Sequence, residues 1–423
     1  MRLIGRSLVL FLMLAARTRG ALADAPEMSS WLLNTTGLTG YNNLPANVQR
    51  IRFSTGSVYV NASGIPSYAI GPWPGNPNVA TNQNWLYRIP RTPTVAGTKT
   101  ATPLGPVGAW TTGVAVFNAR DANSYNNQNI WHQNAVVVEA SGFDSCLGHP
   151  QMTGGYHHHQ HPLCLYVSDS RRHSPILGFA FDGYPIYGPY GYANADGTGG
   201  VKRIRRSYRA RSITQRDSPC CGPAVGTQYP LGYYVEDFEY VAGLGELDPY
   251  NGRFAVTPEY PTGTYAYYTT VDEAGNSAYP YAVGPSYNGV PLLPNGHVAI
   301  GETVSDYVPS SPGRVPENIM VSRVSSSQIV LTWNVSCTPA GASDYGIYEG
   351  QLGSWYGHSA LTCQDTAHDF RQTVTTSTGN TYYLVVPFGS GHEGSYGTAS
   401  SGAEIPPGVS SLCAPVQLPA SCP

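Results

Sequence analysis

Histidine is concentrated in one part of this sequence. Seven of the 11 histidines in the 423-residue chain lie between His132 and His173, and three of them are consecutive, at positions 157–159. Cys146 and Cys164 bracket the densest part of the run. Imidazole is the commonest metal ligand in proteins and also serves as a general acid or base. The concentration therefore predicts a functional site in this segment.

The spacing within the run indicates metal ligation. On a β-strand, successive side chains point to opposite faces. His157, His159 and His161 would then share one face, and Tyr156 and His158 would lie on the other. A His-x-His pair on a strand offers two imidazoles to one Zn²⁺ or Cu²⁺ ion, and a ligand from a neighbouring segment completes such a site.

The remaining ligands must come from elsewhere in the chain. The candidates to join His157 and His159 are His149, His173 and His132. Groups expected to orient the ligands are Asp144, Asp182, Tyr156 and Tyr184. Two alternatives stay open: the histidines bond buried backbone carbonyls without any ion, or they act as acid and base without a metal. The sequence has no Gly-x-Ser-x-Gly elbow, phosphate-binding loop or zinc-protease helix motif.

Composition predicts a mainly β, loop-rich protein. Charged residues make up only 12% of the chain, whereas there are 31 Tyr, 48 Gly and 35 Pro. Tyrosine favours strands, and glycine and proline favour turns. A net charge of -3 provides no field that would attract nucleic acid. The basic segment 202–216 could bind an acidic polysaccharide, but we expect its arginines to pair with nearby carboxylates. The expected partners are Asp217, Glu236, Asp237 and Glu239.

The N-terminus predicts export. Arg2 and Arg6 precede a short apolar run, and Ala21-Leu22-Ala23 forms a small-x-small cleavage site, so residues 1–23 are expected to be a cleaved signal peptide. The run is too short to span a bilayer, and no later segment is long and apolar enough to do so. An uncleaved N-terminal anchor is the alternative. We expect a secreted, periplasmic or cell-surface protein.

Eight cysteines in an exported chain predict disulfides. Cys146 and Cys164 should pair and hold the histidine run in place. Proximity in sequence suggests two further pairs, Cys337 with Cys363 and Cys413 with Cys422. The adjacent Cys220 and Cys221 must form a strained vicinal bridge or stay free.

Patterning predicts two structural units. Strand-like segments recur through residues 24–305, among them 51–60, 135–139 and 263–271. Residues 112–118 weakly resemble residues 182–188, which indicates either two related hairpins or a chance similarity. After a polar linker near 305–313, residues 306–404 resemble a fibronectin type III β-sandwich, and residues 405–423 form a tail.

The motifs around the histidines resemble those of the YHYH-domain family. The similar segments span about residues 50–290 and are best seen at 146–150, 156–159, 162–165, 173–175 and 181–188. The resemblance implies an exported bacterial protein, often joined to fibronectin-like modules, and it names no reaction. Two departures stand out. His158 replaces the tyrosine between the two histidines, and the run 265–268, where some members carry a second Tyr-His-Tyr-His, has no histidine. Any histidine site here must use the first run.

These observations favour an exported module that binds a divalent metal, Cu or Zn. A carbohydrate- or surface-adhesion protein without metal is one alternative, and an extracellular hydrolase is another. A hydrolase would need a carboxylate beside the histidines in an open cleft.

Overall fold

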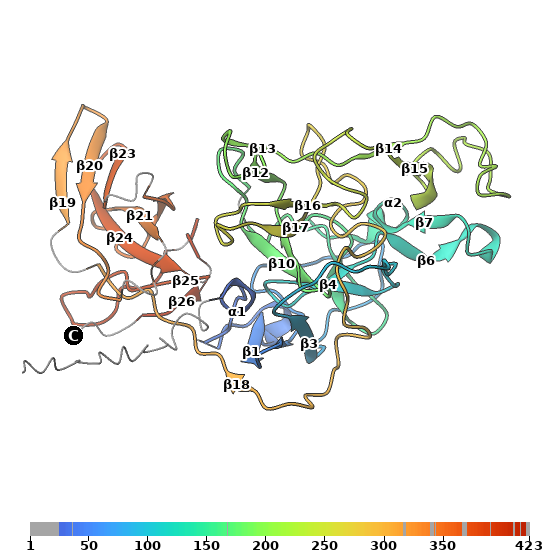
Figure 1. The fold of residues 1–423 in the computed structure, drawn as a ribbon. Helices are drawn as coiled ribbons and strands as arrows, with labels where there is room; N and C mark the ends of the chain where they lie inside the picture. The colour runs from blue at the N-terminus through green and yellow to red at the C-terminus, as the bar shows by residue number, and fades with distance from the viewer. Residues whose placement is uncertain are drawn as a thin grey trace, which may run out of the picture.

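Strands dominate the structure, a computed structural model in which the only two α-helices of the described residues, α1 (Pro26–Ser29) and α2 (Ala135–Val138), have four residues each (Figure 1). It describes residues 25–35, 37–166, 168–315, 319–338, 342, 344–365, 370–389, 391–408, 411–414 and 416–419. The fold is mainly β, as predicted. The expected signal peptide and Cys422 lie outside these ranges. Within them, no helix has the length and apolar character needed to cross a membrane.

Two sheets pack together in the N-terminal part. The first has the order β18-β1-β2-β3, with bounds β18 (Ser305–Asp306), β1 (Val48–Phe53), β2 (Ser57–Ala62) and β3 (Trp85–Pro90). The second has the order β16-β17-β11-β10-β4-β5-β9-β8. Its bounds are β16 (Gly252–Ala255), β17 (Thr264–Tyr268), β11 (Pro185–Tyr187), β10 (Ile176–Ala180), β4 (Pro106–Trp110), β5 (Ala115–Phe117), β9 (Tyr156–His158) and β8 (His149–Pro150). Both sheets contribute to one core, in which Val60 and Tyr87 of the first join Trp110 and Phe179 of the second.

The two halves of the eight-stranded sheet have the same sequence of parallel and antiparallel strand pairings from the centre to the edge. Its central strands β10 and β4 pair antiparallel, and each forms a hairpin with the next strand, β11 or β5. Each hairpin is followed outward by a parallel strand, β17 or β9, and then by an antiparallel edge strand, β16 or β8. The weak echo between residues 112–118 and 182–188 therefore marks two related hairpins, one in each half of the sheet.

The two halves also share a turn. Asp144 accepts hydrogen bonds from the backbone N–H groups two and four residues later, at 2.9 and 3.1 Å, and from the hydroxyl of Tyr156. Asp248 accepts the same set at 2.9 and 3.1 Å, with Tyr265 as the tyrosine. In both turns a glycine, Gly148 or Gly252, lies so close to this tyrosine that no Cβ would fit.

Because the two halves of the sheet have the same strand arrangement, the histidines of β8 and β9 and the neighbouring His159 have counterparts in the second half. His149 follows the glycine of its turn as Arg253 follows Gly252. Val116 lies opposite His158, and the equivalent Ile186 lies opposite Tyr267. His157 and His159 therefore correspond to Ala266 and Tyr268. The same scaffold carries imidazoles in one half only.

The C-terminal strands form two sheets at one end of the molecule (Figure 1). One contains β19 (Met320–Arg323), β20 (Gln328–Thr332) and β23 (Arg371–Thr375). The other contains β22 (Ser359–Thr362), β21 (Asp344–Gln351), β24 (Thr381–Gly389), β25 (His392–Glu393) and β26 (Val416–Gln417). Leu331 of the first sheet and Ile347 and Val385 of the second share a core with Trp333. The resemblance of this part to a fibronectin type III module stays a prediction. Strand β26 lies within the segment expected to be a tail, and β18 lies within the expected linker and pairs with β1.

Three expectations from the sequence are wrong: a strand at residues 135–139, the Cys337–Cys363 disulfide and the Cys413–Cys422 disulfide. Residues 135–139 are not a strand, since Ala135–Val138 form α2 and Glu139 caps it. The Cys146–Cys164 disulfide is present as predicted, but Cys363 pairs with Cys413 and not with Cys337. A backbone hydrogen bond from Ala360 to the carbonyl of Ser411 brings the two segments together across a long stretch of sequence. Cys337 is also disulfide-bonded.

Three short two-stranded sheets complete the N-terminal part. They pair β6 (Arg120–Ser124) with β7 (His132–Asn134), β12 (Tyr190–Tyr192) with β13 (Val201–Arg203), and β14 (Tyr208–Ala210) with β15 (Phe238–Tyr240). Two of the four carboxylates expected to pair with the basic segment 202–216 do so here, whereas Glu236 pairs with His132. Arg209 pairs with Glu239 at 2.9 Å, and the fully buried Arg216 pairs with Asp237 at 2.7 Å. Lys202 and Arg205 share Glu246, a partner not expected from the sequence.

Candidate metal centre

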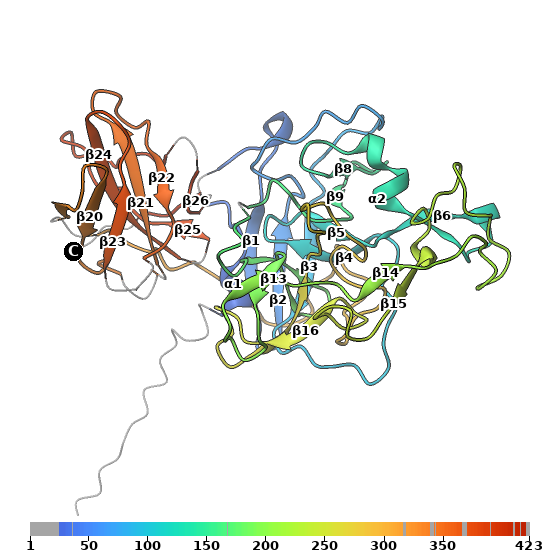
Figure 2. The same ribbon diagram turned by 90° about the horizontal axis from the view of Figure 1, so that it is seen from above.

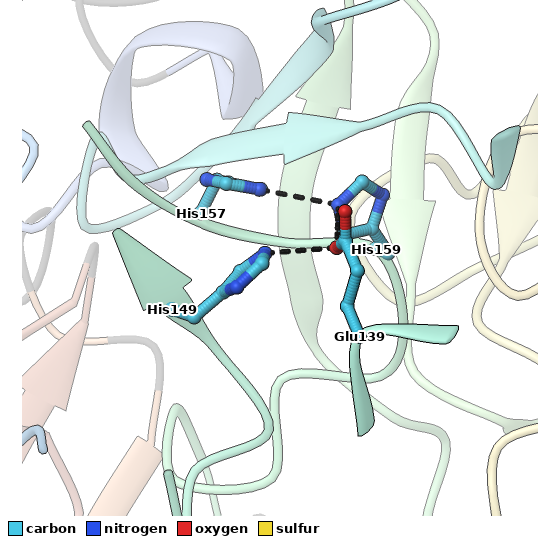
Figure 3. A group of neighbouring side chains, drawn as sticks. All are labelled: Glu139, His149, His157 and His159. Atoms are coloured by element: carbon cyan, nitrogen blue, oxygen red, sulfur yellow. Dashed lines mark hydrogen bonds and ion pairs between the residues drawn. The ribbon is translucent and has the colours of Figure 1, made fainter. Parts of the chain in front are cut away.

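Four side chains meet at the edge of the eight-stranded sheet (Figure 3). Each of Glu139, His149, His157 and His159 offers one ligand atom, and these atoms all lie within 4.8 Å of one another. Strand β8 supplies His149, which lies opposite His157 of β9. His159 follows β9, and Glu139 comes from the end of α2, which lies near β8 and β9 (Figure 2). A hairpin and one helix end thus position the group.

Backbone carbonyl groups determine which ring nitrogen of His157 and of His159 carries the proton. Nδ1 of His157 lies 2.9 Å from the carbonyl oxygen of Gly155, and Nδ1 of His159 lies 2.5 Å from that of Asn118. A carbonyl only accepts, so both Nδ1 atoms carry a proton. In the neutral rings Nε2 is then a bare acceptor. The two Nε2 atoms lie 3.1 Å apart, so their lone pairs face each other when both rings are neutral.

The carboxylate of Glu139 approaches the Nε2 atoms of His149 and His159. Its Oε2 lies 3.0 Å from Nε2 of His149 and 3.2 Å from Nε2 of His159. Yet neither Glu139 Oε2 nor His149 Nε2 has a partner in hydrogen-bond geometry. Burial would raise the pKa of Glu139, but its close contacts with the His149 and His159 rings outweigh burial and hold that pKa well below its usual range. A negative charge therefore stands beside three imidazoles at neutral pH.

The hydrogen bonds of His149 place its ring proton less favourably for metal binding than those of His157 and His159. Its Nδ1 lies 3.2 Å from the amide nitrogen of Asn76, which also donates to the carbonyl of Pro150 at 2.8 Å. The oxygen of the same amide accepts from the backbone N–H of Asn78, which fixes its orientation. Nδ1 of His149 is thus an acceptor, and without an ion its proton lies on Nε2, toward Glu139. For a neutral ring to bind an ion through Nε2, this proton must move to Nδ1, and the Asn76 amide must then turn its nitrogen away from Nδ1.

Aromatic rings enclose the imidazoles. Phe117 stacks on His157 with ring centroids 3.8 Å apart, and Phe143 packs edge-on against His149 at 4.9 Å. The side chains of His149 and His159 are 10% and 5% exposed, and that of Glu139 is 26% exposed. Burial, and then the neighbouring His159 and His149, hold the pKa of His157 well below its usual range. The three histidines are buried, and Glu139 is the most exposed of the four side chains, although its Oε2 is buried.

The structure does not bring His132 and His173 to this cluster, so the expectation that they are ligands is corrected. Nδ1 of His132 pairs with Glu236 at 2.5 Å, and its Nε2 contacts the side-chain oxygen of Asn129 at 2.8 Å. His173 donates from Nδ1 to the carbonyl of Ser174 at 2.7 Å and packs among tyrosines. His161 leaves the face of His157 and bonds Thr269, because β9 ends at His158 and the chain turns.

Two of the expected orienting residues act through the turn and not on the ligands. Asp144 organises the tight turn that leads directly into His149, and Tyr156 bonds to Asp144 on the face opposite His157. His158 also lies on that face, fully buried, with its ring against those of Tyr156 and Trp110.

The other two expected orienting residues belong to the second half of the sheet. Asp182 accepts from the hydroxyl of Tyr267 at 2.6 Å and from the backbone N–H of Gly289 at 2.8 Å. Tyr184 packs against Tyr265 at 5.0 Å. Neither side chain belongs to the cluster.

Glu139 was missing from the sequence-based candidates. The preceding run Ala135-Val136-Val137-Val138 has the composition of a strand, so Glu139 was interpreted as the polar last residue of that strand. The one available signal was position, since Glu139 is a carboxylate just ahead of the histidine-rich segment.

Residues 86–279 match the model of the family described as YHYH protein. The match contains all four cluster residues and both halves of the eight-stranded sheet. The chain therefore contains a YHYH domain. A comparison with curated protein sequences found no match.

Proposed function

We propose that the YHYH domain of this exported chain binds one divalent transition-metal ion through Glu139, His149, His157 and His159. The observation that carries the proposal is the 3.1 Å contact between the bare Nε2 atoms of His157 and His159. Two lone pairs at this distance repel each other unless a metal ion or a proton lies between them. The carbonyls of Gly155 and Asn118 set both tautomers in advance, as outer partners of metal-bound imidazoles commonly do.

The donor set selects a class of ion. Three imidazole nitrogens and one carboxylate oxygen suit Zn²⁺ in a tetrahedral site, and imidazole also suits Cu²⁺. Three neutral rings and one carboxylate leave a single positive charge on a divalent ion. On affinity alone Cu²⁺ binds more tightly than Zn²⁺ to such donors.

The same atoms support a second function. If no ion binds, a proton on Nε2 of His159 would bridge His157 and Glu139, which lie 3.1 and 3.2 Å away. Such a chain of imidazoles and a carboxylate could transfer protons as an acid–base pair, and Phe117 and Phe143 pack against its imidazoles. The two functions differ in one measurable quantity, the metal content of the protein.

Elemental analysis and calorimetric titration of the purified protein test the proposal. We expect one Zn²⁺ or Cu²⁺ per chain, and no binding in a His157→Ala/His159→Ala double variant. His297→Ala is the matched control, because this imidazole is exposed and lies outside the cluster. His158→Ala would be a poor control, since its ring is fully buried. Equal metal affinity in the wild type and the double variant, or no metal binding in either, would contradict the metal site and favour the acid–base function.

Export is part of the proposal. The Cys146–Cys164 and Cys363–Cys413 disulfides are typical of oxidising compartments. Intact-mass measurement of secreted protein should show loss of residues 1–23. A full-length chain in the cytosolic fraction would argue against export.

A further inference from the structure

A pair of thiols stands apart from the other described cysteines. Cys220 and Cys221 are free and exposed, whereas the remaining cysteines within the described residues are all disulfide-bonded. The two are neighbours in sequence, and a hydrogen bond with the Cys220 side chain raises the pKa of the Cys221 thiol. They lie between β14 and β15, in a segment that extends beside β6 at one end of the molecule (Figure 2).

The backbone around the pair is held firmly. The N–H of Gly222 donates to the carbonyl of Arg216 at 3.0 Å, and the indole N–H of Trp131 donates to the carbonyl of Cys220 at 3.1 Å. A Cβ at Gly222 would lie 2.4 Å from the Arg216 side chain and 2.5 Å from Trp131. Cys221 itself adopts a left-handed backbone with φ 71°. The loop thus packs its backbone inward and presents both thiols to solvent.

We propose that Cys220 and Cys221 form a redox-active pair that exchanges with disulfides outside the chain. The thiolate of one cysteine attacks the disulfide R–S–S–R, forms a mixed disulfide and releases one R–S⁻, which takes up a proton. The neighbouring thiol then attacks the mixed disulfide, closes the Cys220–Cys221 bond and releases the second R–SH. The protein loses two electrons and two protons, and the external disulfide gains both.

Adjacency makes the second step fast and the product reactive. The second thiol is already in contact with the first, so the attack is intramolecular and needs no further encounter. Adjacent Cα atoms lie about 3.8 Å apart across a trans peptide bond, which is shorter than the range of about 4.4–6.8 Å that disulfides prefer. By comparison, the Cα atoms of Cys146 and Cys164 lie 5.1 Å apart. Exposed, strained disulfides are the easily reduced ones, so the oxidised pair should in turn oxidise external thiols.

The experiment uses the full chain with oxidised glutathione as the probe and mass spectrometry of the peptide that contains both cysteines. Wild type should yield a peptide two hydrogen atoms lighter and free of glutathione. Cys220→Ser and Cys221→Ser should each retain one glutathione, because the resolving thiol is missing. Reduced glutathione should then reopen the wild-type bond while Cys146–Cys164 stays intact.

Other outcomes would overturn the proposal. They are stable glutathione adducts on the wild-type pair, chains linked to one another through it, no reaction, or a closed bond as resistant to reduction as Cys146–Cys164. The His157→Ala/His159→Ala variant should exchange at the wild-type rate, since none of the cluster residues belongs to this loop.

Discussion

The two matching turns allow a prediction with an internal control. Asp144 and Asp248 accept equivalent bonds in the two halves of the eight-stranded sheet, but only the turn of Asp144 leads into a proposed ligand, His149. Replacing each aspartate with alanine should therefore destabilise the fold in both cases and weaken metal binding in one.

The structure sets the size of each effect. Asp144 accepts from five groups: the backbone N–H of Cys146, Gly148 and Gly71, the indole N–H of Trp73 and the hydroxyl of Tyr156. Asp248 accepts from three, the backbone N–H of Tyr250 and Gly252 and the hydroxyl of Tyr265. An unpaired buried donor costs roughly 1–3 kcal/mol, and incoming water satisfies part of the set. We expect losses of about 3–5 kcal/mol for Asp144→Ala and about 2–4 kcal/mol for Asp248→Ala.

Metal affinity separates the two variants. A residue that orients a ligand without touching the ion typically changes affinity about 10–100-fold, so Asp144→Ala should bind Zn²⁺ that much more weakly. Asp248→Ala should bind it as wild type does. Urea unfolding of the metal-free proteins measures the stabilities, and calorimetric titration measures the affinities. If Asp144→Ala does not fold, Asp144→Asn keeps one acceptor oxygen and serves in its place. Equal affinity losses in both halves would refute the assignment of this turn to the site.

Three further predictions concern stability. Burial holds the pKa of His173 at about 4, below the value of about 6.5 in the unfolded chain, so protons bind the unfolded state first. The free energy of unfolding should therefore fall as the pH drops from about 6.5 to 4, by roughly 3 kcal/mol at most for this residue, and His173→Gln should show a smaller fall in denaturant titrations. Breaking the Cys146–Cys164 bond with paired serines should cost about 3 kcal/mol by the loop-entropy model, and an unchanged denaturation midpoint would contradict this. A fragment ending at residue 404 lacks Cys413, so residues 312–404 should melt at a lower temperature and less cooperatively than residues 306–423.

Local patterns predicted what depends on local sequence. Alternation and turn residues indicated a mainly β chain, and the His157-x-His159 spacing placed both imidazoles on one face, opposite His158. Glu139 and the Cys363–Cys413 pair depend on contacts between segments far apart in the chain. Residue spacing does not predict that a run of three valines folds as one helical turn. It also does not predict a disulfide that depends on the packing of residues 411–413 beside β22.

The same limit explains His132 and His173. Both lie in the histidine-rich segment, so their residue type and sequence distance matched those of His149. Their positions are fixed instead by Glu236 and Ser174, partners that the sequence pattern does not mark. The similarity between residues 112–118 and 182–188 was too weak in sequence to be told from chance, yet the structure confirms two related hairpins, because paired strands preserve a backbone arrangement even where the side chains differ.

The most direct test of the metal centre is a crystal structure of the full chain prepared with one equivalent of Zn²⁺, with diffraction data collected on both sides of the zinc absorption edge. We expect one anomalous peak bonded to Nε2 of His149, His157 and His159 and to the carboxylate of Glu139, with zinc–nitrogen distances of about 2.0–2.1 Å. A peak only at exposed side chains such as His297, with an empty cluster between these four residues, would contradict it.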